Sequence, residues 1–174
     1  MKKFILFLLG AMLLLHLLSC KKEVITGISF EQITTVDSLC EMTGTIDPTD
    51  WSYDSTWTTV EQTLLTFIDP NIILTDSLPG RVTVYPACAN PNNGVFHVDV
   101  FTQRECEMRV AFVNNDFQIL QYQSLHLYGG LITNHYDFRY LTAFHPNAYY
   151  RMYYAFFDAR DSMYYQGHGD LFLQ

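Results

Sequence analysis

Alternating apolar and polar residues dominate the second half of the chain and predict β-strands. The clearest case is residues 94–101, where Phe96, Val98 and Val100 alternate with His97 and Asp99, so that one face of the strand is apolar and the other polar. Further extended segments are expected at 81–85, 106–112, 117–127, 131–141, 149–158 and 163–173. Seven short strands in about 95 residues, separated by short turns, predict an all-β fold, an Ig-like antiparallel β-sandwich of about seven strands.

A short helix is expected ahead of these strands, over residues 59–67. Thr58 and Glu61 have the spacing of a capping box, and Pro70 lies at the point where the helix should end. We therefore expect residues 46–80 to form a short helix and turns that pack on a domain of residues 81–174. Residues 20–45 show no sustained period and are interpreted as a tether, with one strand near residues 24–30.

The longest apolar run is at the N-terminus. Lys2 and Lys3 precede residues 4–18, which are almost entirely apolar, and the run ends in Leu17-Leu18-Ser19-Cys20. This ending resembles the lipobox of bacterial lipoproteins. The resemblance implies that residues 1–19 are a signal peptide and that Cys20 carries acyl chains. The expected location is then the cell envelope, at the outer membrane, and the membrane is a partner through the lipid anchor. The sequence does not decide between the periplasmic and the outer face of that membrane.

An uncleaved membrane anchor is the alternative interpretation of this run. Its sixteen residues, 4–19, would cover about 24 Å as a helix, which is less than the ~30 Å hydrocarbon core. The length therefore favours cleavage.

The charge of the chain argues against a nucleic-acid partner. The formal net charge is -8. Because Lys2 and Lys3 are the only charged residues before Cys20, residues 20–174 have a charge of -10. Such a surface repels phosphate backbones.

Aromatic residues are abundant, with 12 Tyr and 13 Phe. Neighbouring Tyr residues on a strand point to opposite faces, so half of the Tyr residues near the C-terminus, one of each neighbouring pair, are expected to be exposed. Trp51 and Trp57 are candidates for stacking on a ligand such as a sugar. The alternative for these aromatic residues is packing within the sheet.

Three cysteines follow Cys20, and disulfides can form outside the cytoplasm. Cys88 and Cys106 flank a predicted strand and are the candidate disulfide pair, which would leave Cys40 unpaired. The alternative is three buried, reduced thiols.

Residues 90–94, Asn-Pro-Asn-Asn-Gly, followed by Phe96 and Val98, form a second recognisable pattern. It resembles the opening of the C-terminal sorting domains of the type IX secretion system, which reads approximately YPNPNNGxFxV. The resemblance implies an Ig-like sandwich for residues 81–174. Three residues, 87–89, separate Tyr85-Pro86 from this core, and the chain end lacks the Gly-x-Tyr and basic terminus of that family. What it implies is therefore a shared fold more than a shared sorting role.

Two polar groups could carry chemistry. His168 and Asp170, in the sequence Gly-His-Gly-Asp, could bind zinc together with His135 or His145. The spacing of these residues matches no zinc-binding motif such as HExxH or CxxC. This favours the alternative, a glycine-rich turn with a polar surface histidine.

Four acidic residues lie near the two tryptophans and could bind calcium or act on a sugar: Asp47, Asp50, Asp54 and Glu61. A turn and a helix start with favourable charges is the preferred interpretation. Since no other motif of catalysis, metal binding or cofactor binding is present, no enzyme activity and no cofactor are expected.

The expected function is that of a noncatalytic, lipid-anchored cell-envelope protein acting as an interaction or structural module, with an envelope protein or a glycan as partner. The alternatives are a carbohydrate-binding surface lipoprotein and a sorting-like domain.

Overall fold

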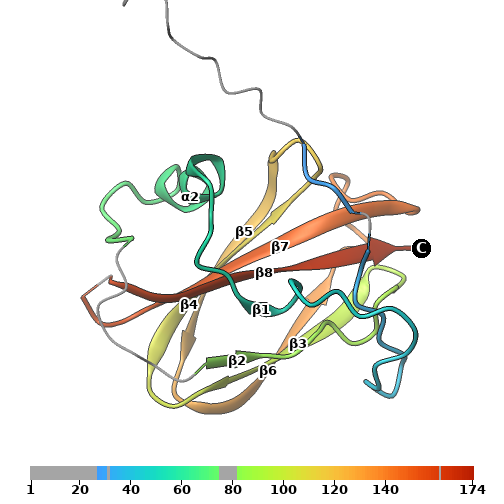
Figure 1. Ribbon diagram of the computed structural model, residues 1–174, viewed down its shortest axis with the longest axis horizontal. Helices are drawn as coiled ribbons and strands as arrows, with labels where there is room; N and C mark the ends of the chain where they lie inside the picture. Colours follow the sequence, from blue (N-terminus) through green and yellow to red (C-terminus); the bar gives the residue numbers. More distant parts are fainter. Residues whose placement is uncertain (1–26, 31, 75–81, 161) are drawn as a thin grey trace, which may run out of the picture.

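Two antiparallel sheets form the core of the protein (Figure 1). The computed structural model describes residues 27–30, 32–74, 82–160 and 162–174. The five-stranded sheet has the order β1 (Ser52–Tyr53), β8 (Met163–Leu173), β7 (Ala148–Phe157), β4 (Cys106–Val113) and β5 (Ile119–Leu127). The three-stranded sheet has the order β2 (Val82–Val84), β3 (Val95–Thr102) and β6 (Gly130–Asp137). The predicted all-β sandwich is confirmed, and its seven expected strands correspond to β2–β8.

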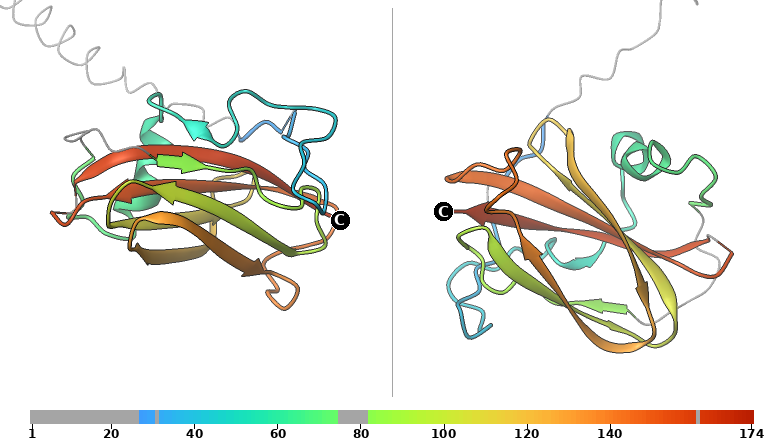
Figure 2. Two further views of the ribbon diagram at one scale, coloured as in Figure 1. Left: turned by 90° about the horizontal axis from the view of Figure 1, so that it is seen from below. Right: turned by 180° about the vertical axis from the view of Figure 1, so that it is seen from behind.

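The main core lies between the two sheets, which form separate layers (Figure 2). The alternation predicted for β3 is observed, because Phe96, Val98 and Val100 are almost fully buried while His97 and Asp99 lie on the outer face. Phe96 stacks on Tyr136 across the β3–β6 pair with ring centroids 5.1 Å apart. Aromatic packing between strands is therefore a principal use of the Phe and Tyr content.

A second apolar cluster covers the other face of the five-stranded sheet. Helix α2 (Thr59–Thr66) contributes Leu64 and Leu65, which pack with Trp57 in the same cluster as Tyr153 of β7. As a result β7, a central strand, is buried on both faces. Tyr153 and Tyr154 point to opposite faces and both are fully buried. The expectation that half of these Tyr residues are exposed was therefore wrong for this pair, because the helix covers the face that we assigned to solvent.

Helix α2 begins as its sequence predicted. Thr58 is the N-cap, its side chain accepts a hydrogen bond from the backbone N–H of Glu61, and the Glu61 carboxylate accepts one from the backbone N–H of Thr58. This capping box satisfies two backbone donors at the helix start. The Glu61 carboxylate also accepts a hydrogen bond of 2.9 Å from the Tyr153 hydroxyl, which joins the helix to the sheet.

The segment before β1 is not a free tether over its described part. It runs beside the C-terminal end of β8 (Figure 1), and Ile28, Thr34 and Val36 are buried. Val36 exchanges two backbone hydrogen bonds with Asn90, of 2.8 and 2.9 Å. We name residues 32–50 the strap. The expectation of a tether over residues 20–45 was wrong for this part, because local pairing supplies order that hydrophobic periodicity does not reveal, and residues 27–30 form no strand.

The expected signal peptide of residues 1–19 and the expected lipidation of Cys20 lie outside the described residues. Within the described part of the chain, no helix has the length and apolar character needed to cross a membrane.

Asn90, in the Asn-Pro-Asn-Asn-Gly sequence, is a fully buried polar residue. Its side-chain amide donates hydrogen bonds to the carbonyl oxygens of Thr34 and Asp170, and its Oδ1 accepts one from the backbone N–H of Phe172. Because buried polar groups need partners, this set of bonds ties the strap, the start of β3 and the end of β8 together.

Candidate functional site

Neither tryptophan is placed to stack on a ligand. Trp51 is 6% exposed and Trp57 is 5% exposed. Trp51 packs in the core between the sheets, stacked against Tyr154, and Trp57 contacts Tyr153 edge-on in the cluster below helix α2. The prediction of a ligand-stacking role for these residues was wrong, because both rings fill gaps in the two cores.

The Gly-His-Gly-Asp sequence is part of β8 and not a turn. A Cβ atom on Gly169 would overlap with the ring of Trp51, and one on Gly167 would overlap with the Tyr154 side chain and the carbonyl oxygen of Ser52. These glycines therefore make room for β1 and its aromatic neighbours. Their role is close packing of a central strand.

His168 is buried on the outer face of β8, opposite Tyr153. Burial, followed by the positive charge of Arg151, lowers the pKa of His168. His135 lies on β6 in the other sheet, and His145 lies in the connection between β6 and β7; both are exposed. The structure does not bring these residues together with His168 and Asp170 as zinc ligands.

The four acidic residues near the tryptophans serve separate structural contacts. Asp47 and Asp54 cap turns by accepting hydrogen bonds from the backbone N–H groups of Thr49 and Thr56. Glu61 belongs to the capping box. The interpretation as turns and a helix start therefore agrees with the structure better than a calcium or sugar-cleaving site.

Asp50 is a buried member of this group. Its two carboxylate oxygens accept hydrogen bonds from the backbone N–H groups of Thr34 and Asp170, of 3.0 and 3.1 Å. Burial, and then the negative charge of Asp170, raise the pKa of Asp50 to about 7. The carboxyl group joins the strap to β8.

The disulfide connects Cys40 with Cys88. Cys106 is buried and free, so the predicted pair of Cys88 and Cys106 was wrong. The two bonded residues are 48 positions apart in sequence, and they meet because the strap places Cys40 beside the segment that precedes β3. Cys106 points into the core between the sheets.

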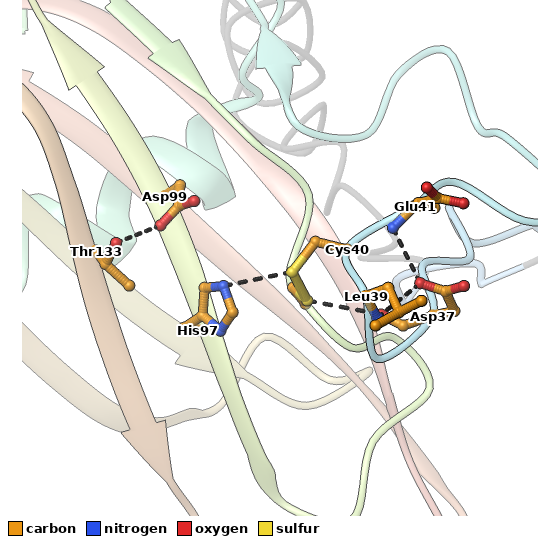
Figure 3. The surroundings of a disulfide bond; sticks show 8 residues. Asp37, Leu39, Cys40, Glu41, His97, Asp99 and Thr133 are labelled. Carbon is orange, nitrogen blue, oxygen red and sulfur yellow. Dashed lines mark hydrogen bonds between the residues drawn. A yellow bond between two sulfur atoms is a disulfide. The ribbon is translucent and has the colours of Figure 1, made fainter.

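His97 lies directly beside this disulfide (Figure 3). The distance from His97 Nε2 to Cys40 Sγ is 3.6 Å. Cys88 and His97 face each other across an antiparallel bridge and exchange two backbone hydrogen bonds of 2.9 Å. The backbone therefore fixes the imidazole next to the sulfur atoms.

A cavity of about 220 Å³ opens at this place. Its lining combines sulfur, imidazole, carboxylate and phenol groups: Cys40, Met42, Tyr85, Cys88, His97 and Asp99. Tyr85 is 47% exposed. This cavity is the candidate functional site, because reactive and polar side chains from distant parts of the chain converge there.

Two residues of the cavity wall, His97 and Asp99, also belong to the outer face of the three-stranded sheet. On this face Asp99 accepts a hydrogen bond of 2.6 Å from the Thr133 hydroxyl, and the rings of His97 and His135 are neighbours at 5.6 Å. The alternate positions of β3 and β6 that point outward are all partly or fully exposed: Val95, His97, Asp99, Phe101, Leu131, Thr133, His135 and Asp137. Unlike the central strands β4, β7 and β8 of the five-stranded sheet, β3 and β6 have one face open to solvent among the described residues.

Comparison with known proteins assigns no family. No family model matches the chain, and no curated protein matches its sequence. One similar solved structure is that of catalytically inactive OgpA from Akkermansia muciniphila in complex with an O-glycopeptide (glycodrosocin) substrate. The identity is 16%, the TM-score is 0.40, and the match covers 62% of this chain and 33% of that one. The chain thus spans about a third of the length of that protein.

Proposed function

We propose that the protein is a noncatalytic, lipid-anchored cell-envelope protein whose β-sandwich serves as an interaction module. The observation that carries this proposal is the difference between the two sheets. The central strands β4, β7 and β8 of the five-stranded sheet are covered on both faces over most of their length, whereas the three-stranded sheet presents an open face of mixed polar and apolar side chains. A rigid sheet with one open face is suited to binding a partner, which is an envelope protein under this proposal.

The lipid anchor rests on the lipobox-like sequence that ends at Cys20. Labelling of cells with a palmitate analogue tests it: the wild-type protein is expected to carry the label and Cys20→Ala to lose it. Unchanged labelling of Cys20→Ala would overturn the anchor. Protease treatment of intact cells then determines on which side of the outer membrane the domain lies.

The interaction face is tested by a photo-crosslinking residue placed at Thr133, on the open face. Phe67, at the C-terminal end of helix α2 and 85% exposed, is the matched control position. We expect intact cells to yield a defined crosslinked envelope protein from position 133 and not from position 67. Equal products from both positions, or no product from position 133, contradict an interaction through this face.

Carbohydrate binding is a second candidate function, and it now rests on Tyr85 instead of the two tryptophans. Trp51 and Trp57 are buried, but Tyr85 exposes its ring at the cavity, beside the polar groups of His97 and Asp99. An aromatic ring with neighbouring hydrogen-bonding groups is a common arrangement for holding a polar ring. A glycan array separates the candidates: binding that Tyr85→Ala abolishes favours a carbohydrate, and its absence favours the protein partner.

The type IX sorting-like role is the third candidate. The Asn-Pro-Asn-Asn-Gly sequence that motivates it contains Asn90, whose buried bonds account for its presence without a sorting receptor. Loss of surface delivery on deletion of residues 81–174 would be the result that supports sorting.

A further inference from the structure

Cys40, Cys88 and His97 bring together three side chains that can bind a metal ion. Their ligand atoms all lie within 4.8 Å of one another, and within the described ranges no other set of three histidine, cysteine or acidic residues meets this condition. Thiolate and imidazole groups are the preferred ligands of zinc in proteins. In the oxidised protein the two sulfur atoms are bonded to each other, so the set becomes available only after reduction.

The backbone holds the three residues together independently of the disulfide. The paired hydrogen bonds between Cys88 and His97 fix two of them. The third, Cys40, lies in a turn closed by a hydrogen bond of 3.0 Å from the Asp37 N–H to the Glu41 carbonyl oxygen. The strap that carries this turn is bonded to the segment before β3 through the Val36–Asn90 pair. Opening the disulfide therefore leaves these backbone contacts in place.

The observed distances suit a tetrahedral zinc ion. With Zn–S of about 2.3 Å and Zn–N of about 2.0–2.1 Å, the sulfur and nitrogen ligands of such an ion lie about 3.5–3.6 Å apart. Cys40 Sγ and His97 Nε2 are 3.6 Å apart. The two sulfur atoms would have to separate to about 3.8 Å, a change that side-chain rotation of the exposed Cys40 can supply.

The cavity beside these ligands leaves a fourth position open. It has a volume of about 220 Å³ and its wall includes the Met42 and Asp99 side chains. A zinc ion with three protein ligands keeps one position for water or an external ligand. The formal charge of -10 on residues 20–174 favours the approach of a cation.

We propose that Cys40, Cys88 and His97 form a redox-gated binding site for a thiophilic divalent metal ion, with Zn²⁺ as the ion tested. The disulfide is the closed state and the dithiol is the metal-binding state. This inference goes beyond the proposed interaction module and does not depend on the lipid anchor.

The gating reaction requires a dithiol reductant, such as a thioredoxin-like protein. One thiolate of the reductant attacks the sulfur of the exposed Cys40, the S–S bond breaks, and its electron pair leaves on the sulfur of Cys88. The second thiolate of the reductant then attacks the mixed disulfide and releases the Cys40 thiolate. The reductant ends as a disulfide and the protein as a dithiol, with two electrons and two protons transferred. Zinc binding then displaces the two thiol protons.

The Cys88 side chain has a polar neighbour that fits this sequence of events. Its Sγ lies 3.6 Å from the carbonyl oxygen of Asp37, which can accept a hydrogen bond from the released thiol. The leaving sulfur is thus provided with a partner in the dithiol state.

The test uses the full chain in detergent, oxidised or reduced by a phosphine and desalted without oxygen. Titration with Co²⁺ reports thiolate coordination through its charge-transfer absorption, and Zn²⁺ competition gives the affinity. We expect one ion per reduced chain, no thiolate band in the oxidised chain, and an affinity at least about tenfold lower for His97→Ala. His126→Ala, a change at an exposed histidine on β5 in the other sheet, is the matched control and should bind as the wild type does.

Three results would overturn the site. The first is a reduced protein without a cobalt–thiolate band. The second is a band that persists in the Cys40→Ser, Cys88→Ser double variant, because Cys106 or an unlipidated Cys20 would then be the ligand. The third is loss of the β-sheet circular dichroism spectrum on reduction without recovery on addition of Zn²⁺, because the proposal requires the backbone to keep the ligands together. None of these results bears on the crosslinking from Thr133, so failure of the metal site and failure of the interaction module are distinguishable.

Discussion

Arg151 and Asp170 face each other across the β7–β8 pair and form a bidentate ion pair on the covered face of the five-stranded sheet. The Nε–Oδ1 distance is 2.5 Å and the Nη2–Oδ2 distance is 2.7 Å. The side chain of Asp170 is 1% exposed and that of Arg151 is 15% exposed. Two parallel charge-assisted bonds make this the most specific polar contact between these strands.

Removing one partner of this pair should destabilise the protein strongly. Asp170→Asn leaves the Arg151 guanidinium buried without a carboxylate, so we expect the free energy of unfolding to fall by about 3 kcal/mol or more. Urea denaturation measures it. Asp137→Asn is the matched control, since Asp137 pairs with Arg139 on the surface, and it should leave stability unchanged within error. Equal effects of the two substitutions would show that burial of the pair is unimportant.

The raised pKa of Asp50 predicts that the stability of the protein depends on pH. The pKa of about 7 in the folded protein exceeds the value of about 3.9 expected for an unfolded chain. The folded state therefore binds the additional proton between these values, and the stabilisation is complete below pH ~4 and is lost as the pH rises through ~7. In that window the wild type should lose stability relative to Asp50→Asn by up to about 1.4 kcal/mol per pH unit.

Denaturation of both proteins at several values between about pH 4 and 8 tests this dependence. Because both share all other titrating groups, the difference between their curves reports the titration of Asp50 together with its coupling to Asp170. Curves that stay parallel throughout the window would contradict the raised pKa.

Gly169 should not tolerate a side chain. Gly169→Ala places a methyl group against the Trp51 ring, and we expect a loss of about 2 kcal/mol or more through overpacking. Gly130→Ala is an informative control, because Gly130 has open space around its Cβ position but a φ of +89°, so that only backbone strain of about 1 kcal/mol applies. Thermal unfolding followed by tryptophan fluorescence measures both; a larger loss for Gly130→Ala would contradict the packing explanation.

The disulfide should contribute substantially to stability. Replacing Cys40 and Cys88 by serine releases a 48-residue loop and should lower the free energy of unfolding by about 4 kcal/mol in the chain-entropy model. Peptide mapping by mass spectrometry under non-reducing conditions should find the Cys40–Cys88 link and an unmodified Cys106. A link between Cys88 and Cys106 would contradict the structure, and Cys106→Ala controls for the loss of a thiol that forms no bond.

Local sequence patterns predicted the elements of this fold well. The alternation around Phe96 identifies β3, and the Thr58–Glu61 spacing identifies the start of helix α2, because both signals arise from contacts within a few residues. The capping interpretation of Glu61 succeeded for the same reason.

Contacts between distant segments could not be predicted in this way. The Cys40–Cys88 bond depends on the path of the strap, which is set by hydrogen bonds to Asn90 rather than by an apolar period. The burial of Trp57 and Tyr153 depends on which face of the sheet the helix covers. Neither relationship has a signature at short sequence range, and the Cys40, Cys88 and His97 cluster was missed for that reason.

The hydrogen bond of 2.8 Å from the Ile28 N–H to the Asn115 carbonyl oxygen determines where the chain enters the domain, and with it the orientation that an anchored protein would adopt. Gly27 is seven positions after Cys20, which limits the reach between them to about 25 Å even when fully extended. A lipid on Cys20 would therefore keep the β4–β5 turn close to the bilayer and would restrict the directions in which the open face of the three-stranded sheet can meet a partner.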